Sequence, residues 1–353
     1  MTKSEWRMND KTTMTKAWAT VRRLVDFREF MIILIILAAA GIMSVSSPDF
    51  ATTDNLSVLL LAVSTQAIVA IGMTVLLVSG GFDLSVGSVV GLAGAVTALC
   101  MVQGVPLPTG ASAEYPFVQF EWIAVNPAAA IAAGLAVGAL VGLANGFIIA
   151  RIGINPFITT LAMMWIARGA LEVITRGTNV YGLPDSFKCI GQGKFCAVQF
   201  PILISLVLIM IGDILLRKSR FFRQNYYIGG NEKAAALSGI NVGRMKIFNY
   251  ALTGFLAAVA GIVMTARFGS ASVTMGTGLE LQVISAVIIG GASLQGGEGT
   301  VLGSFLGCIL MALIVTSLNL LGVDIYWQRL IIGATLLAAV MIDTIGKKRK
   351  GIL

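Results

Sequence analysis

The sequence predicts an all-α fold, a polytopic bundle of about ten transmembrane helices. The chain has 353 residues, of which 57% are hydrophobic and 12% are charged, and its mean hydropathy is +0.88. A soluble protein carries about 25% charged residues. Apolar runs of about 20 residues, the length that crosses a bilayer, recur along the chain. The composition and the recurring apolar runs together indicate a multi-pass protein whose main environment is the lipid bilayer.

Apolar runs divide the central domain, residues 30–344, into ten predicted spans. These spans cover residues 30–47, 56–79, 85–103, 123–150, 156–175, 200–216, 247–267, 281–292, 300–321 and 326–344. The two spans at 56–79 and 281–292 are the least regular. Because glycine pairs weaken a helix, we expect broken or irregular helices beside the glycines that follow these two spans.

Basic residues predict the orientation of the bundle. Seven Lys and Arg residues lie in the N-terminal segment 1–29, seven lie in the loop 217–246, and four lie in the tail 345–353. Cytoplasmic segments of membrane proteins carry an excess of Lys and Arg. We therefore predict that both termini and the loop 217–246 face the cytoplasm, and that the loop 176–199 faces outward.

Two of the four cysteines, Cys189 and Cys196, fall in the outward loop. In a bacterial inner membrane this loop meets the oxidising compartment, where disulfides form. A disulfide between the two cysteines and a pair of free thiols are both compatible with the sequence, because the sequence gives no distance between them.

A glycine-rich motif occurs twice. Residues 80–87, GGFDLSVG, and residues 290–297, GGASLQGG, share the pattern GGxxLxxG at an offset of 210 residues. Each copy follows one of the two irregular spans. The repetition indicates an internal duplication with both halves in the same orientation. A chance match in a glycine-rich membrane protein is the alternative.

The first motif places Asp83 among apolar residues. An ionisable side chain at membrane depth indicates a functional site, in which Asp83 would line or gate a solute path. In the other interpretation its carboxylate caps the helix that begins near Leu84 by accepting hydrogen bonds from free backbone N–H groups. We favour the cap, and the two roles are compatible.

Other polar and small residues of the spans indicate packing. Glycines at every fourth position from Gly134 to Gly146 form a stripe along which another helix can approach closely. Asn145, beside this stripe, would bond a neighbouring helix or contact solute. Arg168 and Glu172 are four residues apart and are expected to pair on one helix face. Asn155, just before a proline, marks a helix start.

The cytoplasmic loop 217–246 contains a polar, helix-forming run. Residues 232–237, EKAAAL, favour a short helix that is bounded by a glycine pair before it and by Gly239 after it. An alanine-rich helix with small side chains can seat in the groove of a partner protein. We favour such an interaction helix over a plain connector.

Several stretches, in the same order along the chain from about residue 30 to residue 343, resemble a known family. They are SGGFDLSVGS, IGGNEKAAALSGINV, GGASLQGGEGTVLGS and LNLLGV, at residues 79–88, 228–242, 290–304 and 318–323. Their sequence resembles the ribose-type sugar permeases of ATP-binding-cassette importers, within the bacterial branched-chain amino acid and sugar permeases. The resemblance covers nearly the whole chain.

The resemblance implies an inner-membrane permease that carries a monosaccharide or related polyol. It also implies a second permease copy or a homologous permease, two cytoplasmic ATPase domains and a periplasmic sugar-binding protein as partners. The residues that would form the ATPase-coupling segment are Gly230, Asn231, Glu232, Ala234, Ala235 and Gly239. In the broader importer motif E-A-A-x-x-x-G, the glutamate position falls on Lys233, one residue after Glu232.

For the translocation path or its gate, the candidates come from the glycine motifs and the polar residues beside them. They are Asp83, Ser85, Asn145, Asn155 and Ser293.

The sequence also argues against catalysis and against ATP, cofactor or metal binding by this chain. It contains no histidine and no G-x-x-x-x-G-K-[ST] motif, so ATP and its magnesium are expected on partner subunits, and no cofactor or metal on this chain. The sequence shows no set of nucleophile and base that would indicate an intramembrane enzyme. The basic residues flank the helices and do not form a nucleic-acid site. An ion-coupled secondary transporter of a small polar solute is the alternative function.

Overall fold

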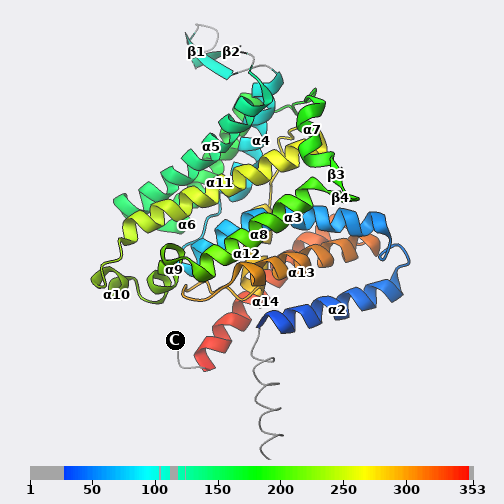
Figure 1. The fold of residues 1–353 in the computed structure, drawn as a ribbon, viewed down its shortest axis with the longest axis vertical. Coiled ribbons are helices and arrows are strands. Elements are labelled where there is room, and N and C mark those ends of the chain that lie inside the picture. Colours follow the sequence, from blue (N-terminus) through cyan, green and yellow to red (C-terminus); the bar gives the residue numbers. More distant parts are fainter. Residues whose placement is uncertain (1–27, 103–104, 112–117, 124, 350–353) are drawn as a thin grey trace, which may run out of the picture.

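The computed structural model describes residues 28–102, 105–111, 118–123 and 125–349. Within them the chain forms a bundle of helices that pack side by side (Figure 1). The helices are α2 (Arg28–Ser46), α3 (Thr53–Val78), α4 (Val86–Val102), α5 (Pro127–Phe147), the π-helical turn η1 (Ile148–Ile152), α6 (Pro156–Thr175), α7 (Asp185–Gln192), α8 (Phe200–Lys218), α9 (Arg220–Gly230), α10 (Glu232–Leu237), α11 (Val242–Phe268), α12 (Leu279–Ile289), α13 (Val301–Leu320) and α14 (Ile325–Arg349).

Seven of these helices are long and apolar enough to cross a membrane, namely α2, α3, α5 with η1, α6, α8, α11 and α13. Shorter apolar helices are formed by α4, α12 and residues Ile325–Met341 of α14. The helical multi-pass bundle is therefore confirmed, whereas the count of ten spans stays a prediction. The expected irregularity within residues 56–79 is wrong, because α3 runs unbroken for 26 residues and the glycines follow its end.

Helix starts follow local capping chemistry. Asn126 caps α5, where its Oδ1 accepts from the Ala129 N–H at 2.8 Å, and Pro127 occupies the first turn, where no N–H is needed. The same Asn-Pro pair starts α6 at Asn155. A helix begins at these points because a side chain satisfies one of its free N–H groups.

The predicted glycine stripe of α5 packs against two neighbouring helices. A Cβ at Gly134 would overlap the Thr97 side chain of α4, and one at Gly142 would overlap the backbone of Tyr250 in α11. Gly254 of α11 faces the stripe in turn. Small residues let the helix backbones approach closely, and α11 consequently lies at the centre of the bundle, against α3, α4 and α5 (Figure 1).

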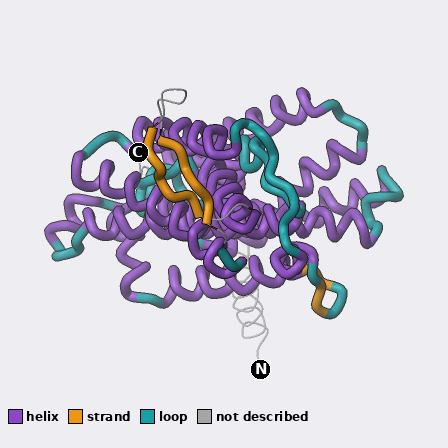
Figure 2. Tube along the Cα trace, turned by 90° about the horizontal axis from the view of Figure 1, so that it is seen from above, coloured by secondary structure: helices purple, strands orange, loops and turns teal. Residues whose placement is uncertain are grey.

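Two short hairpins accompany the helices (Figure 2). Strands β1 (Val105–Ala111) and β2 (Val118–Ile123) pair antiparallel, and β3 (Lys194–Phe195) pairs with β4 (Val198–Gln199). The predicted all-α class holds, since these two-stranded sheets are the only ones that the described residues form beside the helices. The helix of the predicted fourth span also starts later, at Pro127, because Ile123 belongs to β2 and Asn126 caps the helix.

Parts of four predicted segments lie outside the described residues. These are residues 1–27 of the N-terminal segment, residue 103 of the third span, residue 124 of the fourth span and residues 350–353 of the basic tail.

Candidate functional site

The two glycine motifs form connections between consecutive helices. The first connection, residues 79–85, joins α3 to α4, and the second connection, residues 290–300, joins α12 to α13. In each connection a side-chain oxygen accepts a hydrogen bond from the backbone N–H two residues ahead. Asp83 Oδ1 accepts from the Ser85 N–H at 2.7 Å, and Ser293 Oγ accepts from the Gln295 N–H at 3.0 Å. Matched positions of the motif therefore adopt the same type of local turn.

Asp83 lies in a buried polar cluster. Its Oδ1 also accepts the Ser85 hydroxyl at 2.6 Å, and its Oδ2 accepts from Asn145 Nδ2 at 3.3 Å. The Asn145 amide also donates to the Ser85 hydroxyl oxygen at 3.0 Å. All three side chains are at most 1% exposed. The structure thus brings together three of the five path candidates, from the first connection and from α5.

The cap at the start of α4 differs in part from the favoured interpretation. The helix begins at Val86, and the Ser85 carbonyl accepts its first hydrogen bond, from the Val89 N–H at 2.9 Å. Asp83 binds the N–H group of Ser85, just ahead of the helix, rather than a free N–H group of its first turn. Its carboxylate therefore fixes the turn that leads into α4.

The end of α9 lies against both connections. The Gly297 N–H of the second connection donates to the carbonyl of Val78, the last residue of α3, at 2.8 Å. A Cβ at Gly229 would overlap the Val78 oxygen and the Gly297 nitrogen, and would lie 3.0 Å from Gly296 Cα. Only glycine allows this approach of three backbones. Gly229 therefore brings the end of α9 into direct contact with the end of α3 and with the second connection.

Buried side chains also join α9 and α11 to the first connection. Asn249 Nδ2 of α11 donates to Asn225 Oδ1 of α9 at 2.8 Å and to Ser79 Oγ at 3.3 Å. The Tyr250 hydroxyl donates to the Phe82 carbonyl at 3.1 Å. Both asparagines are fully buried. Buried polar groups are costly unless they are hydrogen-bonded, so these contacts fix the relative positions of the three elements.

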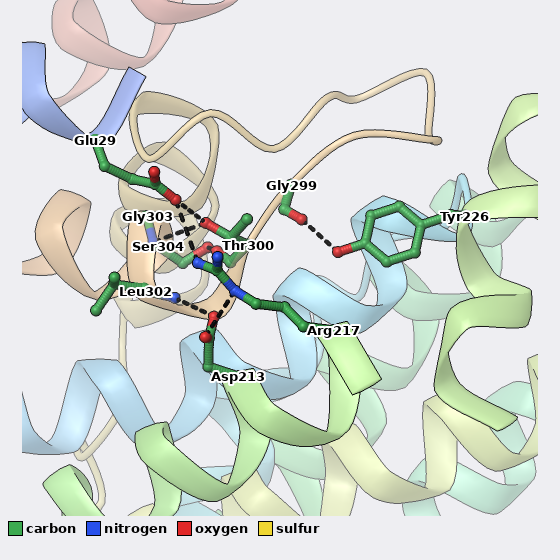
Figure 3. A network of polar contacts seen from close by, with 9 residues as sticks. All are labelled: Glu29, Asp213, Arg217, Tyr226, Gly299, Thr300, Leu302, Gly303 and Ser304. Carbon is green, nitrogen blue, oxygen red and sulfur yellow. Dashed lines mark hydrogen bonds and ion pairs between the residues drawn. The ribbon is translucent and has the colours of Figure 1, made fainter. Parts of the chain in front are cut away.

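A charged network holds the N-terminus of α13 (Figure 3). Arg217 of α8 pairs with Asp213 at 2.7 Å and reaches Glu29 of α2 at 3.4 Å. Glu29 accepts the Thr300 hydroxyl at 2.9 Å, and Asp213 accepts the Leu302 N–H at 3.1 Å. Two carboxylates thus lie at a helix N-terminus, where free N–H groups and the helix dipole favour negative charge.

Tyr226 of α9 joins the same region. Its hydroxyl donates to the Gly299 carbonyl at 2.7 Å, at the end of the second connection (Figure 3). Burial raises the pKa of Tyr226, so the hydroxyl keeps its proton and stays a donor at neutral pH. Both α8 and α9 are consequently bonded to the start of α13.

The predicted interaction helix forms as α10. Asn231 caps it, because its Oδ1 accepts the Ala234 N–H at 3.0 Å, and Gly239 follows its end with a φ of 86°, the left-handed conformation that glycine favours. Glu232 accepts hydrogen bonds from Lys246 of α11 on both carboxylate oxygens, each at 2.8 Å. The Glu232 carboxylate therefore ties α10 to α11 within this chain.

One side of α10 is buried and the other is exposed. Ala235 is buried and packs with Ile228 of α9 and Met245 of α11. Gly230 and Ala234 are exposed, and Leu237 is 91% exposed at the end of the helix. The sequence analysis did not single out Leu237, although it has the largest exposed fraction of any large hydrophobic residue among those that the structure describes.

The remaining candidates lie outside the Asp83 cluster. Asn155 is exposed, and its Oδ1 accepts the Phe157 N–H at 2.8 Å as the cap of α6. Cys189 lies in α7 and Cys196 lies in the turn between β3 and β4, and both are exposed free thiols. The sequence left a disulfide between them and two free thiols open, and the structure has them as free thiols.

Arg168 binds backbone rather than its expected partner Glu172. Its Nη1 donates to the carbonyls of Val273 and Met275, at 2.9 Å each. The guanidinium thereby holds residues 269–278, the segment that leads from α11 to α12.

The charged network of Figure 3 was also missed from the sequence. Asp213 and Arg217 stand four apart in α8 and are a readable helical pair. Glu29 and Thr300 are 271 positions apart, and no local pattern relates them.

Seven membrane-length helices and buried polar connections define a multi-pass membrane protein. Residues 55–340 match the family described as branched-chain amino acid transport system / permease component, and the chain belongs to this family. It is accordingly a permease component, a transport subunit rather than an enzyme.

Sugar permeases are among the similar proteins, which confirms the resemblance found in the sequence. The chain is 38% identical over 333 residues to the ribose import permease protein RbsC of Escherichia coli (strain K12), covering 93% of this chain and 95% of the relative. It is 37% identical over 304 residues to RbsC of Bacillus subtilis (strain 168), covering 86% and 88%. The L-arabinose transport system permease protein AraH of E. coli (strain K12) is 37% identical over 303 residues, covering 86% of each chain. No solved structure gives a significant match.

Proposed function

We propose that the chain is the membrane-spanning subunit of an ATP-driven importer for a monosaccharide or related polyol. The observation that carries this proposal is the similarity to ribose and L-arabinose import permeases along nearly their whole length. In this function a periplasmic binding protein delivers the sugar, and separate ATPase subunits, which bind ATP and Mg²⁺, power its translocation.

The composition of the bundle supports a neutral solute. The helices α4, α5 and α13 contain no charged residue, and α3 contains only Asp54, in its first turn. A neutral sugar needs donors and acceptors for its hydroxyl groups and no fixed counter-charge, so amide and hydroxyl side chains suffice to bind it.

The exposed surface of α10 supports the docking of an ATPase subunit. Leu237 and the small Ala234 side chain would seat in a groove of that partner, in the manner of a helix in a groove. The buried contacts of Gly229 and Tyr226 would then pass a movement of this segment to the second connection. A complete importer would contain two such ATPase domains and a second permease, either another copy or a homologue.

For the buried cluster of Asp83, Ser85 and Asn145, and for Ser293, we propose a role in a gate. These residues lie in or beside the two connections, which the end of α9 contacts at Gly229. A movement of α9 would therefore shift the connections and the polar side chains that they carry. The inner-membrane location, with both termini and the α9–α10 side in the cytoplasm, is part of the same proposal and rests on the distribution of Lys and Arg.

Reconstitution tests the proposed function. Vesicles would contain this permease with its ATPase subunits, and the liganded binding protein would be added with radiolabelled ribose or arabinose. Uptake should require ATP and should disappear when the ATPase subunits are left out. Uptake that persists without them and follows an imposed ion gradient would establish the alternative, an ion-coupled secondary transporter.

A further inference from the structure

A glutamine lies near the middle of the most deeply buried candidate span. Gln66 belongs to α3, whose 26 residues include an apolar window that is 83% buried. It stands about 20 Å along the helix from Thr53, at 1.5 Å per residue. Its side chain is 9% exposed. Polar side chains at membrane depth are expensive and mark solute pathways.

The partner of Gln66 is a second glutamine, on a half-length helix. Gln66 Nε2 donates to Gln282 Oε1 at 2.9 Å. Gln282 lies in the first turn of α12, which has only 11 residues. Just beyond the other end of α12, the second connection bonds the Val78 carbonyl at the end of α3. The helix α12 therefore runs beside only the second half of α3 and starts at about the middle of the span.

An irregular segment leads to this mid-span helix start. Residues 269–278 follow α11 without regular helix, and Arg168 holds their carbonyls. Irregular backbone at membrane depth is tolerated where it is buried in protein or lines a cavity. Half-length helices that begin near the middle of the membrane are a recurrent feature of solute sites in transporters.

The amide pair leaves hydrogen-bonding groups unused. Gln66 Oε1 is fully buried and has no hydrogen-bond partner among the described residues. Within the same described part of the chain, the side-chain nitrogen of the half-buried Gln282 also has none. A buried acceptor without a donor is costly, so a ligand that supplies one is favoured. A hydroxyl group both donates and accepts, which matches one amide oxygen and one amide nitrogen.

We propose that Gln66 and Gln282 form a contact point for a hydroxyl group of the transported polyol, midway across the membrane. This inference rests on the proposed function and assigns residues to its solute path. The pair is neutral, so it would bind a sugar without holding it by charge, and the sugar could leave again.

The test uses the complete importer in vesicles, with uptake and ATP hydrolysis measured separately. In Gln66→Met and Gln282→Met the amide is replaced by an apolar side chain of similar length, which does not hinder membrane insertion. Ser64→Ala is the matched control, because Ser64 is also buried in α3 but its hydroxyl donates to the Leu61 carbonyl of its own helix at 2.8 Å.

We expect each glutamine variant to take up sugar about tenfold more slowly, the effect of one lost hydrogen bond in the range of about 1.4 kcal/mol, while ATP hydrolysis stays within about twofold of the Ser64→Ala value. A series of deoxy analogues gives the second readout. The unaltered permease should disfavour the analogue that lacks the contacted hydroxyl, and Gln66→Met should lose that discrimination.

Three outcomes would overturn the proposal. They are uptake by both variants at the control rate, unchanged discrimination among the deoxy analogues, and failure of both variants to assemble, which would assign the pair to packing. Failure of the unaltered complex to transport any sugar with ATP would instead refute the proposed function itself.

Discussion

At the scale of single residues, the two carboxylate oxygens of Asp83 make different contacts. Its Oδ1 fixes the turn before α4, and its Oδ2 contacts Asn145 of another helix. The Asn145 Oδ1 is buried and has no partner among the described residues. If the side-chain amide of Asn145 rotated by half a turn, its Oδ1 would face position 83 and could accept a hydrogen bond from the NH₂ group of an asparagine there.

We expect Asp83→Asn to keep most of the uptake activity, because its side-chain oxygen still accepts from Ser85 and its NH₂ group can donate to the rotated Asn145 amide. Asp83→Ala should destabilise the permease by about 1 to 3 kcal/mol, since it leaves buried donors without an acceptor. Thermal unfolding of the purified permease and uptake by the assembled complex are the measurements. An Asp83→Asn complex that assembles normally but transports nothing would show that the charge itself serves the gate.

Gly229 provides a second prediction at this scale, with its neighbour as the matched control. A Cβ at Gly229 would overlap backbone atoms of two other segments, whereas one at Gly230 would meet nothing within 4 Å. Gly229→Ala should therefore cost about 1 to 3 kcal/mol of folding stability through overpacking, and Gly230→Ala should leave the free energy of unfolding nearly unchanged. Unfolding temperature and uptake would both be compared. Equal behaviour of the two variants would contradict the contact between α9 and the connections.

At the scale of elements, the sequence predicts most helices but not how they meet. The bounds of α6 match residues 156–175, because a capping asparagine and a proline define its start. The helix α9 was not predicted, since its residues Arg220–Gly230 are polar and lack a span-length apolar run. Asp83, Ser85 and Asn145 were each identified as candidates, but their contact joins residues 60 or more positions apart. Only tertiary packing relates such positions.

The exposed end of α10 carries the prediction at this scale. Leu237→Ser should weaken the association of ATPase subunits by about tenfold or more, as expected for loss of an apolar anchor. The stability of the permease should stay unchanged, because the Leu237 side chain is 91% exposed. Tyr181→Ser is the control, since Tyr181 is 64% exposed and lies near the opposite end of α11. Co-purification of the ATPase with each variant is the measurement, and equal recovery would remove Leu237 from the docking surface.

At the scale of the whole molecule, α11 runs between two ends of the bundle that carry different elements. Near its start lie α9, α10, the two connections and the charged network of Figure 3. Near its end lie α7, with Cys189, and the bridge between Val180 and Ala271. Excess basic residues at the first end favour the cytoplasm. The function of an importer depends on this orientation, because ATPase and binding protein must meet opposite faces.

The orientation gives the last prediction. In a background without the four natural cysteines, a single cysteine would be placed at Lys233 of α10 or at Asp185 of α7, both of which are exposed. In intact cells, a membrane-impermeant thiol reagent should label Asp185→Cys and spare Lys233→Cys, and after lysis it should label both. The two sites lie near opposite ends of the bundle, so one reagent reports on both faces. Labelling of Lys233→Cys in intact cells, with Asp185→Cys protected until lysis, would invert the proposed topology and place the α9–α10 segment out of reach of any cytoplasmic ATPase.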